Sequence, residues 1–319
     1  MLKKQSGLIA AVAAVTLTAS CATSEDQQSD TTDTPSSAAQ PPLTAEAALG
    51  DLAAVDFCAL LDPRTIEEAE GTIDFERPGF SHCLVGVDTP DATMTLTVGN
   101  LYDESQQTVW PTEDEELSRG LHRQSIDSEI GCLRALVFGD DIGLTIAARE
   151  LEGAEQGEPE ATCRIADAAT DGVQSAALSD EVFTHSFQPG SLAEIEPCSL
   201  LDDADAADVL GDGVAAQEAV GGHGCTWPAM TDASAELSFD VALQPDLTDF
   251  ADEIAGRPTM TATLGDFGCE VSTPHIAFSA DDPNEREVVA VSVTASETDA
   301  CAAASELAGL VWPELPESP

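Results

Sequence analysis

The segment at residues 56–62 reads Asp-Phe-Cys-Ala-Leu-Leu-Asp, and the segment at residues 196–202 reads Glu-Pro-Cys-Ser-Leu-Leu-Asp. An acidic, alanine-containing stretch follows each of them, at residues 64–70 and 204–210, and each stretch ends at a glycine. This pattern favours a helix that stops at the glycine. The chain therefore carries the opening of one domain twice.

The match between the two halves continues toward their ends. Residues 92–98 and 235–241 both alternate apolar and polar side chains, as half-buried strands do. Four cysteines stand in step in each half, with steps of 25, 49 and 31 residues in the first and 27, 44 and 32 in the second. We infer that one domain has been duplicated within the chain.

The first residues have the pattern of a secretion signal. Lys3 and Lys4 precede an apolar run over residues 8–18, which is too short to span a bilayer. The run ends in small residues directly before Cys21, the pattern of a lipobox, in which a diacylglycerol is attached to the cysteine sulfur. The leucine of this lipobox lies one place earlier than usual, so a plain secreted protein is the alternative. We predict that Cys21 is the lipid attachment site.

An exported chain meets an oxidising compartment, where cysteines form disulfides. Four cysteines allow three pairings in each half. Economy of chain favours four bonds that each tie a helix to a nearby strand: Cys58–Cys83, Cys132–Cys163, Cys198–Cys225 and Cys269–Cys301. A metal site is the alternative, but zinc sites use short Cys-x-x-Cys spacings, which this sequence lacks.

The order of elements is clearest in the second half. A closing helix is expected over residues 298–310, where apolar side chains recur at helical spacing and Thr298 or Asp299 can cap the first turn. A helical piece is expected to end at residues 250–254, and strands are expected at 259–264, 276–279 and 288–294. A short acidic helix is expected between the strands of each copy. The larger aromatic residues are expected in the core, namely Trp227, Phe239, Phe267, Phe278 and Trp312.

These patterns predict an α+β fold, with two tandem copies of a disulfide-stapled domain, each an antiparallel sheet with helices on one face. We assign residues 1–20 to the signal peptide, 21–48 to a disordered tether poor in large apolar residues, 49–170 to the first repeat, 171–195 to a linker and 196–319 to the second repeat.

Composition excludes some classes of partner. After removal of the two lysines with the signal, 9 arginines face 60 acidic residues, which gives a net charge of 9 − 60 = −51. Nucleic acids require a basic surface, so we expect no nucleic-acid binding. The acids are spread along the whole chain, which favours a solvated surface over a cation site.

Two histidines stand near equivalent cysteines, His82 before Cys83 and His223 before Cys225. They are our candidate ligand-binding residues, with a turn beside a disulfide as the structural alternative. The sequence offers no catalytic serine motif and no phosphate-binding loop. We expect no cofactor, no metal and no catalytic residue.

The motif Cys-x-Leu-Leu-Asp, the Gly-x-Gly-Cys-Thr-Trp of residues 222–227 and the helix led by Cys301 resemble the actinobacterial lipoprotein family called domain of unknown function 3558. The second copy resembles the family over residues 197–313 and the first, less closely, over 57–169. The closing helix also resembles extracellular sensor domains of mycobacterial-type receptor kinases. These resemblances imply an envelope location, paired disulfides and a binding or sensing role.

We therefore expect a monomer anchored by lipid to the extracytoplasmic face of the cell membrane. Its expected function is that of a non-enzymatic module that binds an envelope lipid, glycan or partner protein. The alternatives are an extracytoplasmic hydrolase that uses acidic residues and histidine, and a structural spacer.

Overall fold

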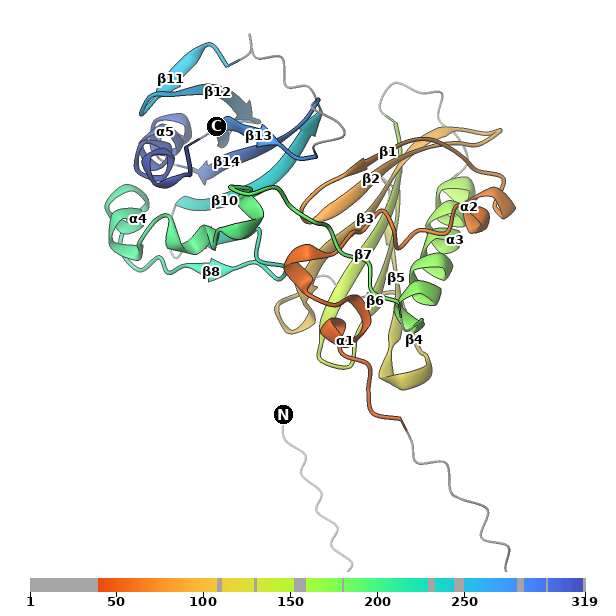
Figure 1. Ribbon diagram of the computed structural model, residues 1–319. Coiled ribbons are helices and arrows are strands. Elements are labelled where there is room, and N and C mark those ends of the chain that lie inside the picture. Colours follow the sequence, from red (N-terminus) through yellow and green to blue (C-terminus); the bar gives the residue numbers. More distant parts are fainter. Residues whose placement is uncertain are drawn as a thin grey trace, which may run out of the picture. The chain divides into compact units, whose positions relative to one another are not determined.

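The computed structural model describes residues 40–107, 111–128, 131–151, 159–179, 181–228, 233–243, 250–279, 284–296 and 298–317. Residues 40–319 form one compact unit. This unit contains two antiparallel sheets of seven strands each, with helices packed on them (Figure 1). The α+β fold with two tandem domains predicted from the sequence is therefore confirmed.

The first sheet has the strand order β1-β2-β3-β7-β6-β5-β4. It consists of two meanders, β1 to β3 and β4 to β7, which meet where β3 pairs with β7. The strands are β1 (Thr72–Pro78), β2 (His82–Asp88), β3 (Thr93–Asp103), β4 (Glu113–Glu116), β5 (His122–Ser128), β6 (Gly131–Val137) and β7 (Ile142–Glu150).

The second sheet has the order β11-β12-β13-β14-β10-β9-β8. Read from the β8 edge, this is the order of the first sheet, with β8 to β14 in the places of β1 to β7. The central pair is again formed by the third and the last strand, here β10 and β14. The shared order supports duplication of one domain. The strands are β8 (Gln217–Glu218), β9 (Gly224–Trp227), β10 (Ala233–Leu243), β11 (Asp252–Ile254), β12 (Arg257–Leu264), β13 (Gly268–Ala277) and β14 (Glu285–Ala295).

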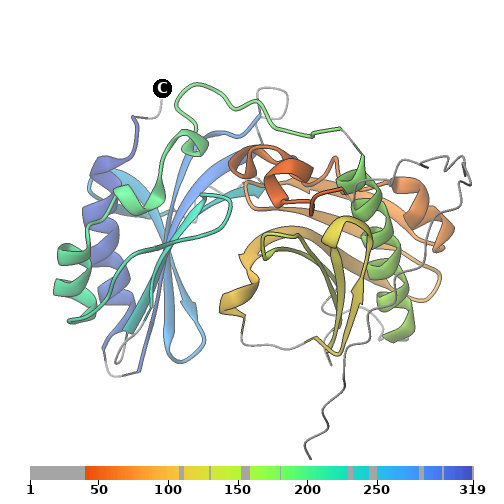
Figure 2. The ribbon, with the colours of Figure 1, turned by 90° about the horizontal axis from the view of Figure 1, so that it is seen from below.

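Each domain has a short opening helix and a longer closing helix. In the first domain these are α2 (Pro63–Glu68) and α3 (Pro159–Leu178), and in the second they are α4 (Asp203–Leu210) and α5 (Ala300–Val311). Figures 1 and 2 show α3 lying along the first sheet and α5 along the second. Among the described residues, no helix is long and apolar enough to cross a membrane.

An aspartate occupies the N-cap position of three of these helices. The side chains of Asp62, Asp202 and Asp299 accept hydrogen bonds from backbone N–H groups in the first turns of α2, α4 and α5. Such caps satisfy donors that have no partner within the helix. Asp299 thus confirms one of the two predicted caps of the closing helix.

Each sheet buries one row of alternate side chains beneath its helices, because successive side chains of a strand point to opposite faces. In the first core Val85 and Leu96 pack with Ile165 of α3. In the second core Val291 packs with Leu307 of α5. Trp227, Phe239, Phe278 and Trp312 are buried as predicted, but Phe267 is 60% exposed at the turn between β12 and β13.

The eight cysteines form the four bonds that economy of chain favoured. In each domain one bond joins the segment before the opening helix to the second strand, through Cys58–Cys83 and Cys198–Cys225. The other joins the sixth strand to the closing helix, through Cys132–Cys163 and Cys269–Cys301. The opening and closing helices of each domain are thereby held close to a covalent link with their own sheet.

The structure shifts the expected domain boundaries outward. Residues 43–48, expected in the tether, include buried Leu43, and Thr44 caps a short helix, α1 (Ala45–Leu49), that packs in the first core. The helix α3 continues to Leu178 and buries Val173, so residues 171–178 are not a linker. Alanine is common in linkers, but here Ala45, Ala48 and Ala177 are buried in the first core.

The end of the expected linker belongs to the second domain. The hydroxyl of Ser191 donates to Glu287 Oε1 at 2.6 Å, and the Leu192 N–H donates to Glu287 Oε2 at 2.8 Å. Leu192 is fully buried in the second core. Burial raises the pKa of Glu287 to about 6, although both hydrogen bonds act in the opposite direction.

One expected helical piece is a strand instead. Residues 252–254 form β11 and pair with residues 257–259 of β12, so the helical piece expected to end at 254 is wrong. Pairing with a neighbouring strand has overridden local helix propensity there, as tertiary context commonly does. In the first domain the corresponding edge strand is the acidic β4, which pairs with β5.

Replacing Cys269 and Cys301 together by alanine is expected to lower the free energy of unfolding of the second domain by about 3–4 kcal/mol, since the bond closes a loop of about 32 residues. The matched variant of the first domain, with Cys132 and Cys163 replaced, should lose a similar amount. Urea unfolding followed by circular dichroism measures both. A loss below about 1 kcal/mol in either domain would show that the bond constrains the unfolded chain little.

Candidate functional site

A residue of the first domain lies in the core of the second. Phe80, in the turn between β1 and β2, is 1% exposed and belongs to the buried cluster that includes Trp227 and Leu237. Its ring centroid lies 4.9 Å from the ring of His223 and 5.3 Å from the ring of Phe278. The two domains therefore share part of one hydrophobic core.

Phe80 is one of five rings that we call the aromatic cluster. The other members come from the segment between the domains and from the second domain, and the cluster consists of Phe80, His185, Phe187, His223 and Phe278. His185 packs edge-on against Phe278 at 5.4 Å and lies 5.8 Å from Phe187. The edge-on arrangement is one that aromatic rings prefer.

Backbone contacts fix the cluster to the start of the first domain. Val55 forms a bridge with Thr184, and the His185 N–H donates to the Ala54 carbonyl at 2.7 Å. Asp56 N–H donates to the Phe183 carbonyl at 3.0 Å. We call residues 51–56 the opening segment and residues 183–187 the strap. The strap therefore pairs with the opening segment through a short antiparallel bridge.

His223 holds the same opening segment from the second domain. Its ring is 5% exposed, and its Nε2–H donates to the Ala53 carbonyl at 2.8 Å. Burial lowers the pKa of His223, and this effect outweighs the opposing effects of the Ala53 hydrogen bond and of the charge on Asp51. His223 is therefore a neutral ring that donates from Nε2. Its Nδ1 is buried and makes no hydrogen bond within the described residues.

His185 is in a similar electrostatic state. Burial lowers its pKa, although the nearby charge of Asp56 acts in the opposite direction. The His185 Nε2 lies 3.6 Å from the nearest Asp56 oxygen, beyond hydrogen-bond distance, and is buried. The Asp56 carboxylate instead accepts the backbone N–H groups of Cys58 and Ala59, both at 3.1 Å.

The two candidate histidines of the sequence occupy different environments. His82 is half-buried at the start of β2, where Ser81 Oγ lies 3.2 Å from its Nδ1. It stands one residue before Cys83, whereas His223 stands two residues before Cys225. Since side chains alternate between the faces of a strand, a one-residue offset reverses the direction of the ring. His82 makes none of the ring contacts of the aromatic cluster given by the described residues.

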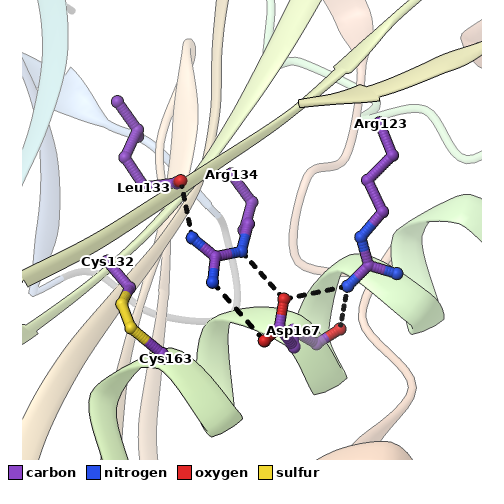
Figure 3. Close-up of a disulfide and its surroundings, with 6 residues drawn as sticks. All are labelled: Arg123, Cys132, Leu133, Arg134, Cys163 and Asp167. Carbon is purple, nitrogen blue, oxygen red and sulfur yellow. Dashed lines mark hydrogen bonds and ion pairs between the residues drawn. A yellow bond between two sulfur atoms is a disulfide. The ribbon is translucent and has the colours of Figure 1, made fainter. Parts of the chain in front are cut away.

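Asp167 of α3 forms ion pairs with two arginines of the first sheet, Arg123 and Arg134 (Figure 3). Asp167 accepts hydrogen bonds from Arg134 Nε at 2.8 Å and from Arg123 Nη2 at 3.0 Å. Burial raises the pKa of Asp167, but the hydrogen bonds and charges of Arg134 and Arg123 outweigh it, so the pKa is lowered. The arginines thus fasten α3 to β5 and β6 beside the Cys132–Cys163 bond.

A pocket of about 400 Å³ lies between α2 and the start of β1. It is lined by Pro63, Glu67, Glu70, Gly71, Thr72 and Ile73. In the part of the chain that the structure describes, no three histidine, cysteine or acidic side chains converge in a geometry that could hold a metal ion. The predicted lipid site, Cys21, lies outside the described residues.

The sequence identified His223 as a candidate site residue and Phe278 as a core residue, but His185 was not predicted as their partner. The signal was present in the stretch Phe-Thr-His-Ser-Phe at residues 183–187, which places three rings within a segment otherwise typical of a linker. Nothing in the sequence around Phe80 indicates that its ring packs in the core of the other domain.

The chain matches no protein-family model, no curated protein and no solved structure. The resemblance to the lipoprotein family, drawn from short cysteine motifs, gains no support from these comparisons and stays a prediction.

The variant Phe80→Ala is expected to destabilise the second domain by about 3–5 kcal/mol, because it empties a fully buried site in that core. The signal is the fluorescence of Trp227 and Trp312 during urea unfolding, in a background where Trp110 is replaced by phenylalanine. The matched control Phe267→Ala removes an exposed ring and should change the stability by less than about 0.5 kcal/mol. Equal effects of the two variants would contradict the shared core.

Proposed function

We propose that the chain is an exported protein, held at the extracytoplasmic face of the cell membrane by a lipid on Cys21. Its two stapled domains would form a binding or interaction module for an envelope ligand or partner. The observation that carries the proposal is the set of four disulfides at matched positions of both domains. Disulfides of this kind persist in oxidising compartments and are rare in the cytosol.

The leader supports the same location. Residues 1–20 combine two lysines, an apolar run and small residues before Cys21, as a lipoprotein signal does. A polar stretch rich in serine, threonine and proline follows, and the folded unit begins after it. Such a composition suits a tether between an anchor and a domain. A single lipid chain gives marginal membrane binding, so a diacylglycerol is the appropriate anchor.

The state of His223 supports a binding role over a hydrolase that would use this histidine. The hydrolase alternative uses acidic residues and a histidine, with His82 and His223 as the candidates, and that histidine must reach the proton that it transfers. Instead, His223 is buried and its Nε2–H is bonded to a backbone carbonyl. The shared core around Phe80 also distinguishes the chain from a spacer made of two independent domains, since it makes one unit of them.

The variant Cys21→Ala is expected to lose its lipid and leave the membrane. Metabolic labelling with palmitate, followed by partition into detergent, measures this directly: the parent chain should be labelled and enter the detergent phase. The matched control Thr23→Ala, which alters a neighbouring small residue, should behave as the parent. Retention of label by the Cys21→Ala variant would show that the anchor lies elsewhere.

The binding role predicts a ligand that survives gentle purification. The processed protein is recovered from the envelope of the producing organism without denaturant and weighed by native mass spectrometry. We expect a discrete additional mass that disappears on denaturation, together with the loss of eight hydrogens for four disulfides. The released mass then gives the ligand class. A bare protein mass, with no associated protein, would contradict ligand carriage and favour the spacer.

A further inference from the structure

We infer that the aromatic cluster is an acid-sensitive latch: while His185 and His223 are neutral it holds the opening segment against the strap and the second domain, and protonation of the two rings releases it. The inference is independent of the proposed function, because it concerns only contacts within the folded unit.

A second proton on His223 would have no acceptor at Nδ1, and the nearest acceptor for a second proton on His185, an oxygen of Asp56, lies 3.6 Å from Nε2, beyond hydrogen-bond distance. His223 already uses Nε2–H for the Ala53 carbonyl, and its Nδ1 is buried beside the Phe80 ring. His185 has its Nε2 buried within the cluster, with the Phe278 ring edge-on at 5.4 Å. An added proton would place a positive charge among apolar rings. Attraction to the ring faces offsets only part of the hydration that such a charge loses.

The charged groups around the latch do not reverse this balance. Burial lowers the pKa of both histidines despite the nearest carboxylates, Asp51 for His223 and Asp56 for His185. The Asp56 oxygen nearest to His185 already accepts two backbone N–H groups. Three further acids lie on the elements packed around the cluster. Glu218 lies beside Gly222, and Asp240 lies beside Gly79. The backbone carbonyl of Glu285 accepts the Phe278 N–H.

The latch controls a small set of contacts that act together. His223 binds Ala53, His185 N–H binds Ala54, and Val55 bridges to Thr184. Three consecutive residues of the opening segment are thus held by the strap and the second domain. Beyond the strap, His275 donates to the Gly190 carbonyl at 2.9 Å and Glu287 holds Ser191 and Leu192. Burial also lowers the pKa of His275 and raises the pKa of Glu287 to about 6, so the chain beyond the strap has titrating contacts of its own, separate from those of the latch.

The direction of the pH dependence follows from linkage. Each histidine binds its proton less readily in the closed latch than in the open one, where its pKa returns to about 6.5. The closed state is therefore fully favoured above about pH 6.5 and weakens as the pH falls toward the lowered pKa of each closed ring. In that window each histidine increases the opening equilibrium by up to about tenfold per pH unit, and the two together by up to about a hundredfold.

Hydrogen exchange of the processed full chain tests the inference. Protection factors, corrected for the intrinsic pH dependence of exchange, are measured between pH 7.5 and 5 for peptides that contain Asp56 and His185. We expect protection at these amides to fall steeply with pH, while central-strand peptides that contain Leu96 and Val291 stay protected. Constant protection at Asp56 and His185, or loss of protection everywhere at once, would overturn the latch.

Glutamine variants assign the effect to the two rings. In His223→Gln the side-chain amide can still donate to Ala53 but cannot titrate, and His185→Gln likewise removes only one titrating group. Each single variant should reduce the logarithmic slope of opening by up to one per pH unit, and the double variant should abolish it. The control His122→Gln, at an exposed ring on β5, should keep the parent slope. An unchanged slope in the double variant would overturn the assignment.

A second measurement is made on the parent chain and does not depend on the folding of any variant. The imidazole proton signals of His185 and His223 are titrated by nuclear magnetic resonance. Both should titrate below 6.5 with the latch closed. A titration of either ring at or above 6.5 would mean that its charged form is favoured in the cluster, which overturns the inference.

Discussion

Two disulfides in each domain bind the helical ends of a repeat to the sheet between them, and the rest of the fold depends on this constraint. Alanine and valine make up about half of the buried residues of the two cores, and aromatic residues make up 4% of the chain. Small side chains bury little area, so hydrophobic burial alone supports such cores weakly. The covalent links reduce the freedom of the unfolded chain and so allow long sheets to stand on modest cores.

Against this common plan, the two domains differ where they meet. The first extends its opening with α1 and lengthens its closing helix to twenty residues, whereas the second closes with twelve. Phe80 leaves the first domain and completes the second core, beside a histidine that has no equivalent environment in the first. Duplication therefore produced two copies of a scaffold, and divergence at one turn and one strap joined them into a single unit.

The sequence was most informative where chemistry is local or repeated. Cysteine spacing gave the disulfide pairs, and Asp299 gave the start of α5, because both signals lie within short stretches. Long-range pairing could not be predicted from the sequence. The residues around 252–254 do not indicate that this segment pairs with β12. Phe267 has the composition of a core residue, but its position in a turn exposes it to solvent. For the same reason His223 could be singled out from its neighbours, while its partners Phe80 and His185, distant in sequence, could not.

The strand β4 lies at the edge of the first sheet, and its four residues, Glu113 to Glu116, are all exposed acids. A free strand edge offers unpaired backbone groups to any other extended chain. On a crowded surface, where many copies of one molecule stand side by side, such an edge is a route to aggregation. Four adjacent negative charges repel an identical edge on a neighbour, so this strand keeps copies of the chain apart at no cost to the core.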